Sequence, residues 1–444
     1  MSVSAGTGSL DFASRQSGEP IAAPGDTILR LPSAIVFGCG TIEQLGGVVS
    51  SEGRCALVCS DPGVSQTEGY ERAIRSMARS GITTHVYTHT PADVPIESAR
   101  ECVDGVSDDD IDVIVGIGGG SALDMAKLAS VLLSHPQALA SYYGEDRLPG
   151  PCLPIVAAPT TAGTGSEVSP VAVLRDPDRP MKIGISSRYL IPRAAVCDPE
   201  LTLTCPAATT AYAGIDALVH ALEAYTAATR PTWRDYPGPV FRGKSYFSDF
   251  HALGAIQLIH RALERAVFHG NDLQARTMML LGSLSAGIAF AQAGTAGAHA
   301  LQYPLGARTS TPHGLGVGLL APYVLDFIRP TAERELAIVG RTMGVCDDHA
   351  DEAEAAARAI GEISRLVRAI GLPGSLAELS IREADLSQIA DEASTVARLV
   401  DNSPRKLDRE ALIAILRAAW NGDETTSDHG KNPQSVDFES HASR

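Results

Sequence analysis

The 444-residue sequence lacks the features that mark membrane, secreted and nucleic-acid-binding proteins. No apolar run reaches the roughly 18 residues that a membrane-spanning helix needs, and residues 1–20 have no apolar stretch typical of a signal peptide. Lys and Arg form no cluster, and acidic residues outnumber basic residues by 52 to 36. The eight cysteines include no CxxC pair, which favours buried, reduced thiols over disulfides or a zinc ribbon. We therefore expect a cytoplasmic protein with no membrane or nucleic-acid partner.

The apolar patterns along the chain predict two domains between two tails. In residues 29–203, short β-branched runs alternate with helical patterns, which is typical of a doubly wound parallel sheet. In residues 204–420, apolar residues recur with the period of a helix, and no strand is expected. We expect an α/β domain followed by an all-α domain, disordered tails at 1–28 and 421–444, and an ordered surface loop at 230–246.

A glycine-rich turn follows one of the expected strands. These strands are predicted at 55–61, 84–89, 112–118 and 154–160. Gly119, Gly120 and Ser121 come directly after the third and begin a predicted helix, with Asp124 one turn further on. Glycines at this point let backbone N–H groups approach a pyrophosphate, and the helix N-terminus favours the negative charge. The spacing departs from GxGxxG, and a tight turn with a purely structural use is the alternative.

Two further elements favour a nucleotide. The segment PTTAGTGSE (159–167) follows the fourth predicted strand and offers hydroxyls at Thr160, Thr161 and Thr164. Ligands of open α/β sheets collect at that edge, although a capping turn is the alternative. Asp61 ends the first predicted strand, where an acid accepts hydrogen bonds from ribose hydroxyls and repels a 2′-phosphate; capping the next helix is the other interpretation. Together these elements predict NAD, with NADP disfavoured.

Four side chains in the second half suggest a metal site. Asp216 and His220 are four residues apart on a predicted helix and leave its same face, although an ordinary i,i+4 pair would look the same. His299 and His313 lie in apolar, glycine-rich surroundings, where a lone histidine is more often a hydrogen-bonded core residue. One carboxylate and three imidazoles suit Fe(II), Zn(II), Co(II) or Mn(II), with open positions for a substrate oxygen.

The combined motifs resemble those of the iron-containing (group III) alcohol dehydrogenases over roughly residues 30–420. The matching motifs are GGGSALDMAK, PTTAGTGSE, DPEL, GIDALVHALEAY and the segment from His299 to His313. The resemblance implies a dehydroquinate synthase-like fold with the active site in the cleft between an α/β nucleotide-binding domain and an all-α domain. It assigns Asp216, His220, His299 and His313 to the metal, with Fe(II) favoured and Zn(II) the alternative. It assigns these cofactor contacts: Asp61, Gly119, Gly120, Ser121, Thr160, Thr161, Thr164 and Lys182.

The sequence departs from the family pattern at three places. Many members carry a histidine four residues after the third metal ligand, where this chain has Tyr303. If that histidine passes a proton, the resemblance implies either that Tyr303 does so through its phenol or that the proton takes another route. This tyrosine and the insert at 230–246 resemble the hydroxyacid–oxoacid transhydrogenase branch, which retains its nicotinamide. The usual Asn-Pro is replaced by Val94-Pro95.

The resulting hypothesis is a metal-dependent oxidoreductase that transfers a hydride between NAD(H) and an alcohol, an aldehyde or a ketone, including acidic hydroxy or oxo compounds. A hydroxyacid–oxoacid transhydrogenase with retained cofactor is one alternative. A dehydroquinate synthase-like lyase is another, disfavoured because no basic phosphate cluster lies near the metal motif. Arg308 is a candidate contact for a substrate anion, with an ordinary surface role as the alternative. The family resemblance implies a homodimer or larger homo-oligomer.

Overall fold

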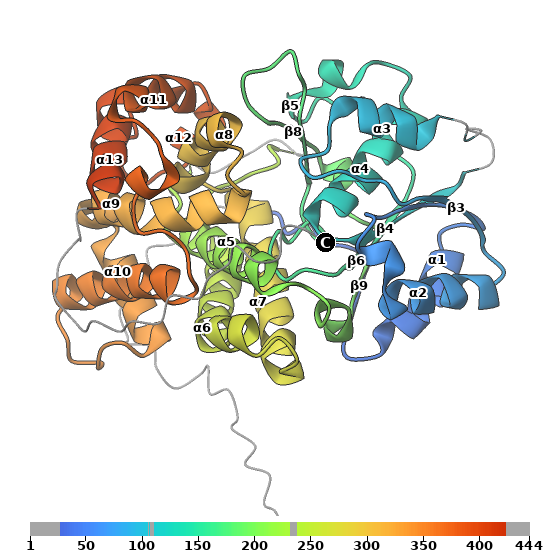
Figure 1. The fold of residues 1–444 in the computed structure, drawn as a ribbon, viewed down its shortest axis with the longest axis horizontal. Helices are drawn as coiled ribbons and strands as arrows, with labels where there is room; N and C mark the ends of the chain where they lie inside the picture. Colours follow the sequence, from blue (N-terminus) through green and yellow to red (C-terminus); the bar gives the residue numbers. More distant parts are fainter. Residues whose placement is uncertain (1–26, 105, 107–110, 231–237, 423–444) are drawn as a thin grey trace, which may run out of the picture.

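The computed structural model describes residues 27–104, 106, 111–230 and 238–422. Most of the two tails expected to be disordered, 1–28 and 421–444, lies outside the described residues. The same is true of residues 231–237, at the centre of the predicted loop at 230–246. The N-terminal half is built on six parallel strands, and the C-terminal half on helices, with the two halves side by side (Figure 1). The last strand ends at Cys197, and the first long helix of the second half begins at Ala207.

The main sheet has the strand order β1-β9-β6-β4-β2-β3, and every neighbouring pair is parallel. Its strands are β1 (Ala34–Phe37), β2 (Cys55–Cys59), β3 (Thr83–Tyr87), β4 (Val113–Gly118), β6 (Ile155–Pro159) and β9 (Ala194–Cys197). A separate three-stranded sheet contains β5 (Gly144–Glu145), β7 (Val171–Leu174) and β8 (Ile183–Ser186), in which β7 and β8 are antiparallel. The four strands predicted from sequence are β2, β3, β4 and β6.

Helices cover both faces of the main sheet, because the side chains of its strands alternate between two apolar cores. In β2, Leu57 and Cys59 join the core that includes residues of α3 and α4, whereas Ala56 and Val58 join the core that includes residues of α1 and α2. This is a doubly wound arrangement. The four helices are α1 (Leu45–Ser50), α2 (Glu68–Arg79), α3 (Ile96–Val103) and α4 (Gly120–Ser134).

Among its described residues, the C-terminal half consists of helices and their connecting loops, with one isolated bridge between Thr229 and Gly243. Helix α5 packs against α6, α7 and α9, and most of its residues from Gly214 onward are buried. The helices are α5 (Ala207–Thr226), α6 (Tyr246–Phe268), α7 (Leu273–Ala293), α8 (Gly297–Thr309), α9 (His313–Met343), α10 (Glu352–Ala369), α11 (Leu386–Ser394), α12 (Ala397–Val400) and α13 (Arg409–Asn421). In the part of the chain that the structure describes, no single helix has the length and apolarity of a membrane span, and a bent pair, α7 with α8, meets those criteria only jointly.

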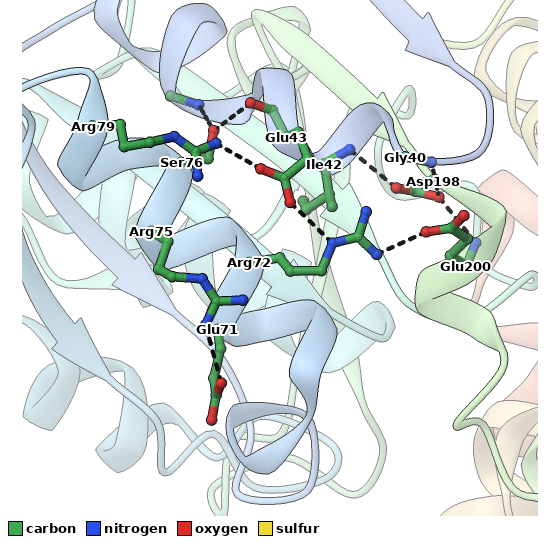
Figure 2. A network of polar contacts seen from close by, with 11 residues as sticks. Gly40, Ile42, Glu43, Glu71, Arg72, Arg75, Ser76, Arg79, Asp198 and Glu200 are labelled. Atoms are coloured by element: carbon green, nitrogen blue, oxygen red, sulfur yellow. Dashed lines mark hydrogen bonds and ion pairs between the residues drawn. The ribbon is translucent and has the colours of Figure 1, made fainter.

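The DPEL motif fixes one edge of the main sheet (Figure 2). The Asp198 carboxylate is fully buried and accepts hydrogen bonds from the backbone N–H groups of Gly40, Ile42 and Glu200 at 3.0–3.2 Å. Arg72 of α2 donates to Glu200 of the same motif at 2.7 Å. The short 3-10 helix Pro199–Thr202 is thereby tied to the segment that follows β1. The contacts of this motif are therefore structural, since they join the ends of β9 and β1.

The loop that follows β6 joins the two halves. Residues 160–167 pack directly on the helices of the second half. The contact is so close at Gly163 that an added Cβ atom would lie 2.7 Å from the Cβ of Ala213 on α5. Gly165 has a φ of +58°, and a Cβ there would lie 2.5 Å from the Cα of Gly287 on α7. Glycine is thus required at 165 both by the backbone conformation and by the close approach.

Candidate active site

Three imidazole nitrogens converge on one carboxylate in the helical half. Asp216 Oδ1 lies 3.6 Å from His299 Nε2 and 3.8 Å from His313 Nε2, and ligand atoms of these three residues lie within 4.8 Å of one another. Asp216 is on α5, His299 near the start of α8 and His313 at the start of α9, so three helices contribute to one point. Residues separated by nearly a hundred positions in sequence are thus brought together by the fold.

His220 lies beside this group, on the other oxygen of the carboxylate. Its Nε2 is 3.9 Å from Asp216 Oδ2, and its ring stacks on that of His299 with the centroids 4.7 Å apart. The opposite side is covered by Phe290, whose ring centroid is 4.5 Å away. The four metal ligands predicted from the sequence therefore lie together. Ligand atoms of Asp216, His299 and His313 are within 4.8 Å of one another, and His220 lies beside these three.

The polar atoms of this cluster fit a divalent metal. Asp216 Oδ1 and His299 Nε2 are buried and have no hydrogen-bond partner within the described residues. An unsatisfied buried polar atom costs about 1–3 kcal/mol, so atoms of this kind aimed at one point favour a ligand that satisfies them. One carboxylate oxygen with imidazole nitrogens is a donor set that suits Fe(II) or Zn(II).

The protonation states agree with that fit. Burial lowers the pKa of His220 to about 4 and that of His313 to about 3, so both rings are neutral near pH 7 and can donate a lone pair. Burial would raise the pKa of Asp216, but the neighbouring imidazoles outweigh it and hold the carboxyl ionised. For His299, burial is outweighed by Glu223 and Asp216, which raise its pKa to about 9; a metal would therefore have to displace a proton.

Glu223 is a site residue that the sequence reasoning missed. Its Oε2 lies 2.6 Å from His299 Nδ1, and its two oxygens accept hydrogen bonds from the backbone N–H groups of Ala296 and Ala298 at 2.7 Å. A carboxylate on Nδ1 fixes the ring so that Nε2 faces the metal position. The signal was present, since residues 216, 220 and 223 share one face of a helix.

We predict that Glu223→Gln lowers the metal affinity by about 10–100-fold, because the amide fixes His299 less firmly and withdraws the negative charge. Metal content after dialysis against a chelator measures this. Glu362→Gln is the matched control, since Glu362 pairs with His260 at 2.8 Å outside the cavity described below. Equal metal retention in the two variants would contradict the role of Glu223.

The two loops predicted to bind the nucleotide contact each other. Gly119 precedes α4 and Gly120 begins it, and no side chain caps that helix N-terminus. A Cβ added to Gly119 would lie 3.3 Å from Thr161 Cγ2, and one added to Gly120 would lie 2.5 Å from Thr164 Cγ2. Thr160 is buried, and its backbone N–H donates to the carbonyl of Gly118 at 3.0 Å. The start of α4 and the 160–167 loop are therefore packed so closely that glycine is needed at 120.

Asp61 carries out the capping role and also reaches the glycine turn. Its Oδ1 accepts hydrogen bonds from the backbone N–H groups of Gly63 and Val64, both at 2.9 Å. Its Oδ2 lies 3.2 Å from the point that a Cβ of Gly118 would occupy. The two interpretations offered by the sequence are therefore compatible, since one oxygen caps the turn and the other borders the predicted nucleotide site.

Asp124 is bound mainly to the protein itself. Its carboxylate accepts hydrogen bonds from Ser166 Oγ at 2.8 Å and from the Val173 N–H at 3.0 Å. One turn further along α4, the fully buried Lys127 donates to Ser166 Oγ and to the carbonyl of Val171. Burial lowers the pKa of this lysine to about 8. Asp124 and Lys127 thus fix the second loop onto α4, although Asp124 also borders the cavity.

Lys182 and the unusual Val94-Pro95 segment meet on the α/β side of the cavity. Lys182 forms an ion pair with Asp93, and both residues line the cavity together with Val94. Asp93 and Val94 have φ values of 64° and 43°, a conformation that side chains rarely adopt. The replacement of Asn by valine therefore coincides with a strained backbone that presents Asp93 to Lys182.

A cavity of about 190 Å³ lies between the two halves, and part of each predicted set of residues lines it. The α/β half contributes Gly120, Ser121 and Thr164, and the helical half contributes Asp216, His220 and His313. Three further lining residues from the helical half are Phe241, Tyr303 and Arg398. The Tyr303 ring lies 6.1 Å from that of His313, between centroids. Among the described residues, Arg308 does not line the cavity, and it forms an ion pair with Glu392. These contacts favour an ordinary surface role for Arg308 over contact with a substrate anion.

Comparison with known proteins agrees with this architecture. Residues 32–199 match the family model described as iron-containing alcohol dehydrogenase, and residues 210–420 match its C-terminal counterpart. Long-chain-alcohol dehydrogenase 1 of Geobacillus thermodenitrificans is 37% identical over 87% of this chain and 94% of its own length. The mitochondrial hydroxyacid-oxoacid transhydrogenase of Caenorhabditis elegans is 29% identical over 86% of this chain and 88% of its own. A crystal structure of 1,3-propanediol oxidoreductase superposes with a TM-score of 0.83 at 31% identity, covering 89% of this chain and all of the other.

These findings define the class of protein as an oxidoreductase with the dehydroquinate synthase-like fold, which confirms the fold class expected from the sequence. The chain belongs to the iron-containing alcohol dehydrogenase family. The sequence resemblance to that family is therefore confirmed, and the family implies a metal.

Proposed function

We propose that this protein transfers a hydride between NAD(H) and a small alcohol or carbonyl compound, with one divalent metal held by Asp216, His220, His299 and His313. Fe(II) is favoured and Zn(II) is the alternative. The observation that carries the proposal is the convergence of Asp216, His299 and His313 beside a cavity that residues of both predicted nucleotide loops also line. The family relationship supports the same activity.

When bound, the metal supplies Lewis acidity toward a substrate oxygen, and the nicotinamide supplies or accepts the hydride. The chain provides the geometry for both. Gly119, Gly120 and Ser121 bring backbone N–H groups to the pyrophosphate, and Asp61 is offered to the ribose, which favours NAD over NADP. Thr160, Thr161 and Thr164 close the opposite side, while Asp124 and Lys182 hold the walls in place. Apolar residues such as Phe290 and Phe241 limit the access of water.

Tyr303 is proposed to hold the proton that the substrate oxygen gains or loses. Burial raises the pKa of its phenol, so the hydroxyl stays protonated at neutral pH and acts as a donor. We predict that Tyr303→Phe lowers kcat by about a hundredfold while leaving the melting temperature and the KM for NADH unchanged. Tyr303→His should restore part of kcat, because an imidazole also carries a proton. Full activity of the phenylalanine variant, measured by steady-state kinetics, would remove Tyr303 from the reaction.

The decisive experiment measures NADH or NADPH oxidation by iron-loaded and zinc-loaded protein against a panel of aldehydes, ketones and oxo acids. The expected result is turnover with NADH that is lost on chelation and restored by metal. A second function, hydroxyacid–oxoacid transhydrogenation, is favoured by Tyr303 and by the insert at 230–246, which are two separate features of the sequence. Steady turnover of a hydroxy acid with an oxo acid, without added NAD, would select it. Absence of both activities would redirect attention to lyase chemistry.

We further propose that the protein works in the cytoplasm as a homodimer or larger homo-oligomer. The acidic net charge of −16 and the absence of a basic cluster support a small-molecule substrate with no nucleic-acid or membrane partner. Light scattering of the purified chain measures the oligomeric state.

A further inference from the structure

Arg398 is a cation that lines the cavity from the helical half. It lies on α12, and its guanidinium carbon is 4.5 Å from the centre of the Phe241 ring, with both side chains lining the cavity. Tyr303 lines the same wall, and the charge of Arg398 is near enough to lower the pKa of the Tyr303 phenol against the effect of burial. Arg398 therefore lies in the same part of the cavity as Tyr303, whose ring is 6.1 Å from that of His313 between centroids.

The guanidinium of Arg398 has no counter-ion. Within the described ranges, no carboxylate forms an ion pair with it and no hydrogen bond involves it, so its one strong contact is the face of Phe241. Arginines of the neighbouring elements behave differently: Arg308, Arg382 and Arg409 each pair with an acid on the surface. A partly buried cation without an anion is costly, so it favours an anionic ligand.

The other charged groups that line the cavity are already engaged. Lys182 pairs with Asp93, and the Asp124 carboxylate accepts hydrogen bonds from Ser166 and Val173. Asp216 belongs to the metal cluster. Arg398 is thus the lining cation, among those the structure describes, whose charge the protein does not balance.

We propose that Arg398 binds a carboxylate on the substrate, so that the preferred substrates are alcohols and carbonyl compounds that carry one. This inference rests on the hydride transfer proposed above and specifies its substrate class. A guanidinium presents two parallel N–H donors that match the two oxygens of a carboxylate, and stacking on Phe241 orients that fork. In the reductive direction the carbonyl carbon gains the hydride of the reduced nicotinamide and the carbonyl oxygen gains a proton. The substrate carboxylate is unchanged.

The test compares two aldehydes of equal chain length, succinic semialdehyde and butanal, which differ in a terminal carboxylate. The variants are Arg398→Gln, Arg398→Lys and, as a matched control outside the cavity, Arg308→Gln. We expect the parent protein to prefer succinic semialdehyde. Arg398→Gln should lower kcat/KM for that substrate by about 10–100-fold, chiefly through KM, as loss of a hydrogen bond to a charged group implies. Its kcat/KM for butanal should fall by much less, because Arg398 acts on that substrate only through its charge near Tyr303, and its KM for NADH should not change. Arg398→Lys should recover part of the loss.

A binding measurement separates this proposal from the proposed activity. Succinate should bind to the metal-containing parent protein in a calorimeter and bind at least about tenfold more weakly to Arg398→Gln. If neither aldehyde is reduced, the hydride-transfer proposal fails, and the calorimetry alone decides the role of Arg398.

Three results would overturn the assignment of Arg398. An equal loss with both aldehydes would make the residue structural. A raised KM for NADH, with the aldehyde preference unchanged, would assign the guanidinium to a cofactor phosphate. A parent protein that does not distinguish the two aldehydes and does not bind succinate would leave no role for a carboxylate.

Discussion

Asp216→Ala protein is expected to be purified without a bound metal and without measurable dehydrogenase activity. The carboxylate is the one anionic group on which His220, His299 and His313 converge. Removing one partner from a buried charged cluster costs about 3–5 kcal/mol, which corresponds to about a thousandfold in metal affinity. Elemental analysis of the protein after metal loading measures the effect directly.

The control for this variant is Asp326→Ala, because Asp326 pairs with Arg329 on α9 outside the cavity. It should retain the metal content and kcat of the parent. Circular dichroism establishes that both variants fold. A folded Asp216→Ala protein that binds one equivalent of iron as tightly as the parent would exclude this carboxylate from the metal site.

Gly120→Ala should weaken NADH binding by about 10–100-fold. The added Cβ would lie 2.5 Å from Thr164 Cγ2 and 3.2 Å from its Oγ1, so the second loop would have to move away from the start of α4. Crowding of this kind costs about 1–3 kcal/mol, and the displaced loop would no longer close over the cofactor. The dissociation constant follows from the fluorescence of bound NADH.

A second substitution makes this test specific. Thr164→Ser removes the methyl group that the new Cβ would meet and keeps the hydroxyl, so the double variant should regain much of the affinity. Gly361→Ala serves as the control, since a Cβ at that position of α10 would have no neighbour within 4 Å. Undiminished NADH binding by Gly120→Ala would show that these two loops do not enclose the nucleotide.

The parts of the fold with a strong local pattern could be predicted from the sequence. Strands β2 and β4 are rich in Val, Ile and Leu and are buried on both faces, so their runs are nearly continuous. Strands β1 and β9 have no comparable pattern in the sequence. Each has only four residues, and the sequence of β9 is AAVC. Alanine has little preference for strands, and β9 is formed through its position between β6 and β1.

The same distinction applies to the site. Asp216 and His220 could be found because their spacing on one helix is visible in the sequence. Glu223 carried the same signal, but a single glutamate in a helix is common, and its burial against His299 becomes evident only in the structure. Arg398 had no signal at all, since it lies on a four-residue helix nearly a hundred positions from Tyr303 in sequence. Its importance depends on the packing that leaves it without a counter-ion.

The glycine contacts of the 160–167 loop connect the predicted dinucleotide site to the predicted metal site. Gly163 touches Ala213, which precedes Asp216 by one turn of α5, while Thr161 and Thr164 of the same loop border the glycine turn at 119–120. The backbone that would receive the dinucleotide and the helix that would hold the ion are thus in direct contact. Occupying either place would restrict the surface on which the other depends, so we expect the two affinities to be thermodynamically linked. The ion should bind more tightly once the dinucleotide is present, and the dinucleotide should in turn be retained longer by protein that holds its ion.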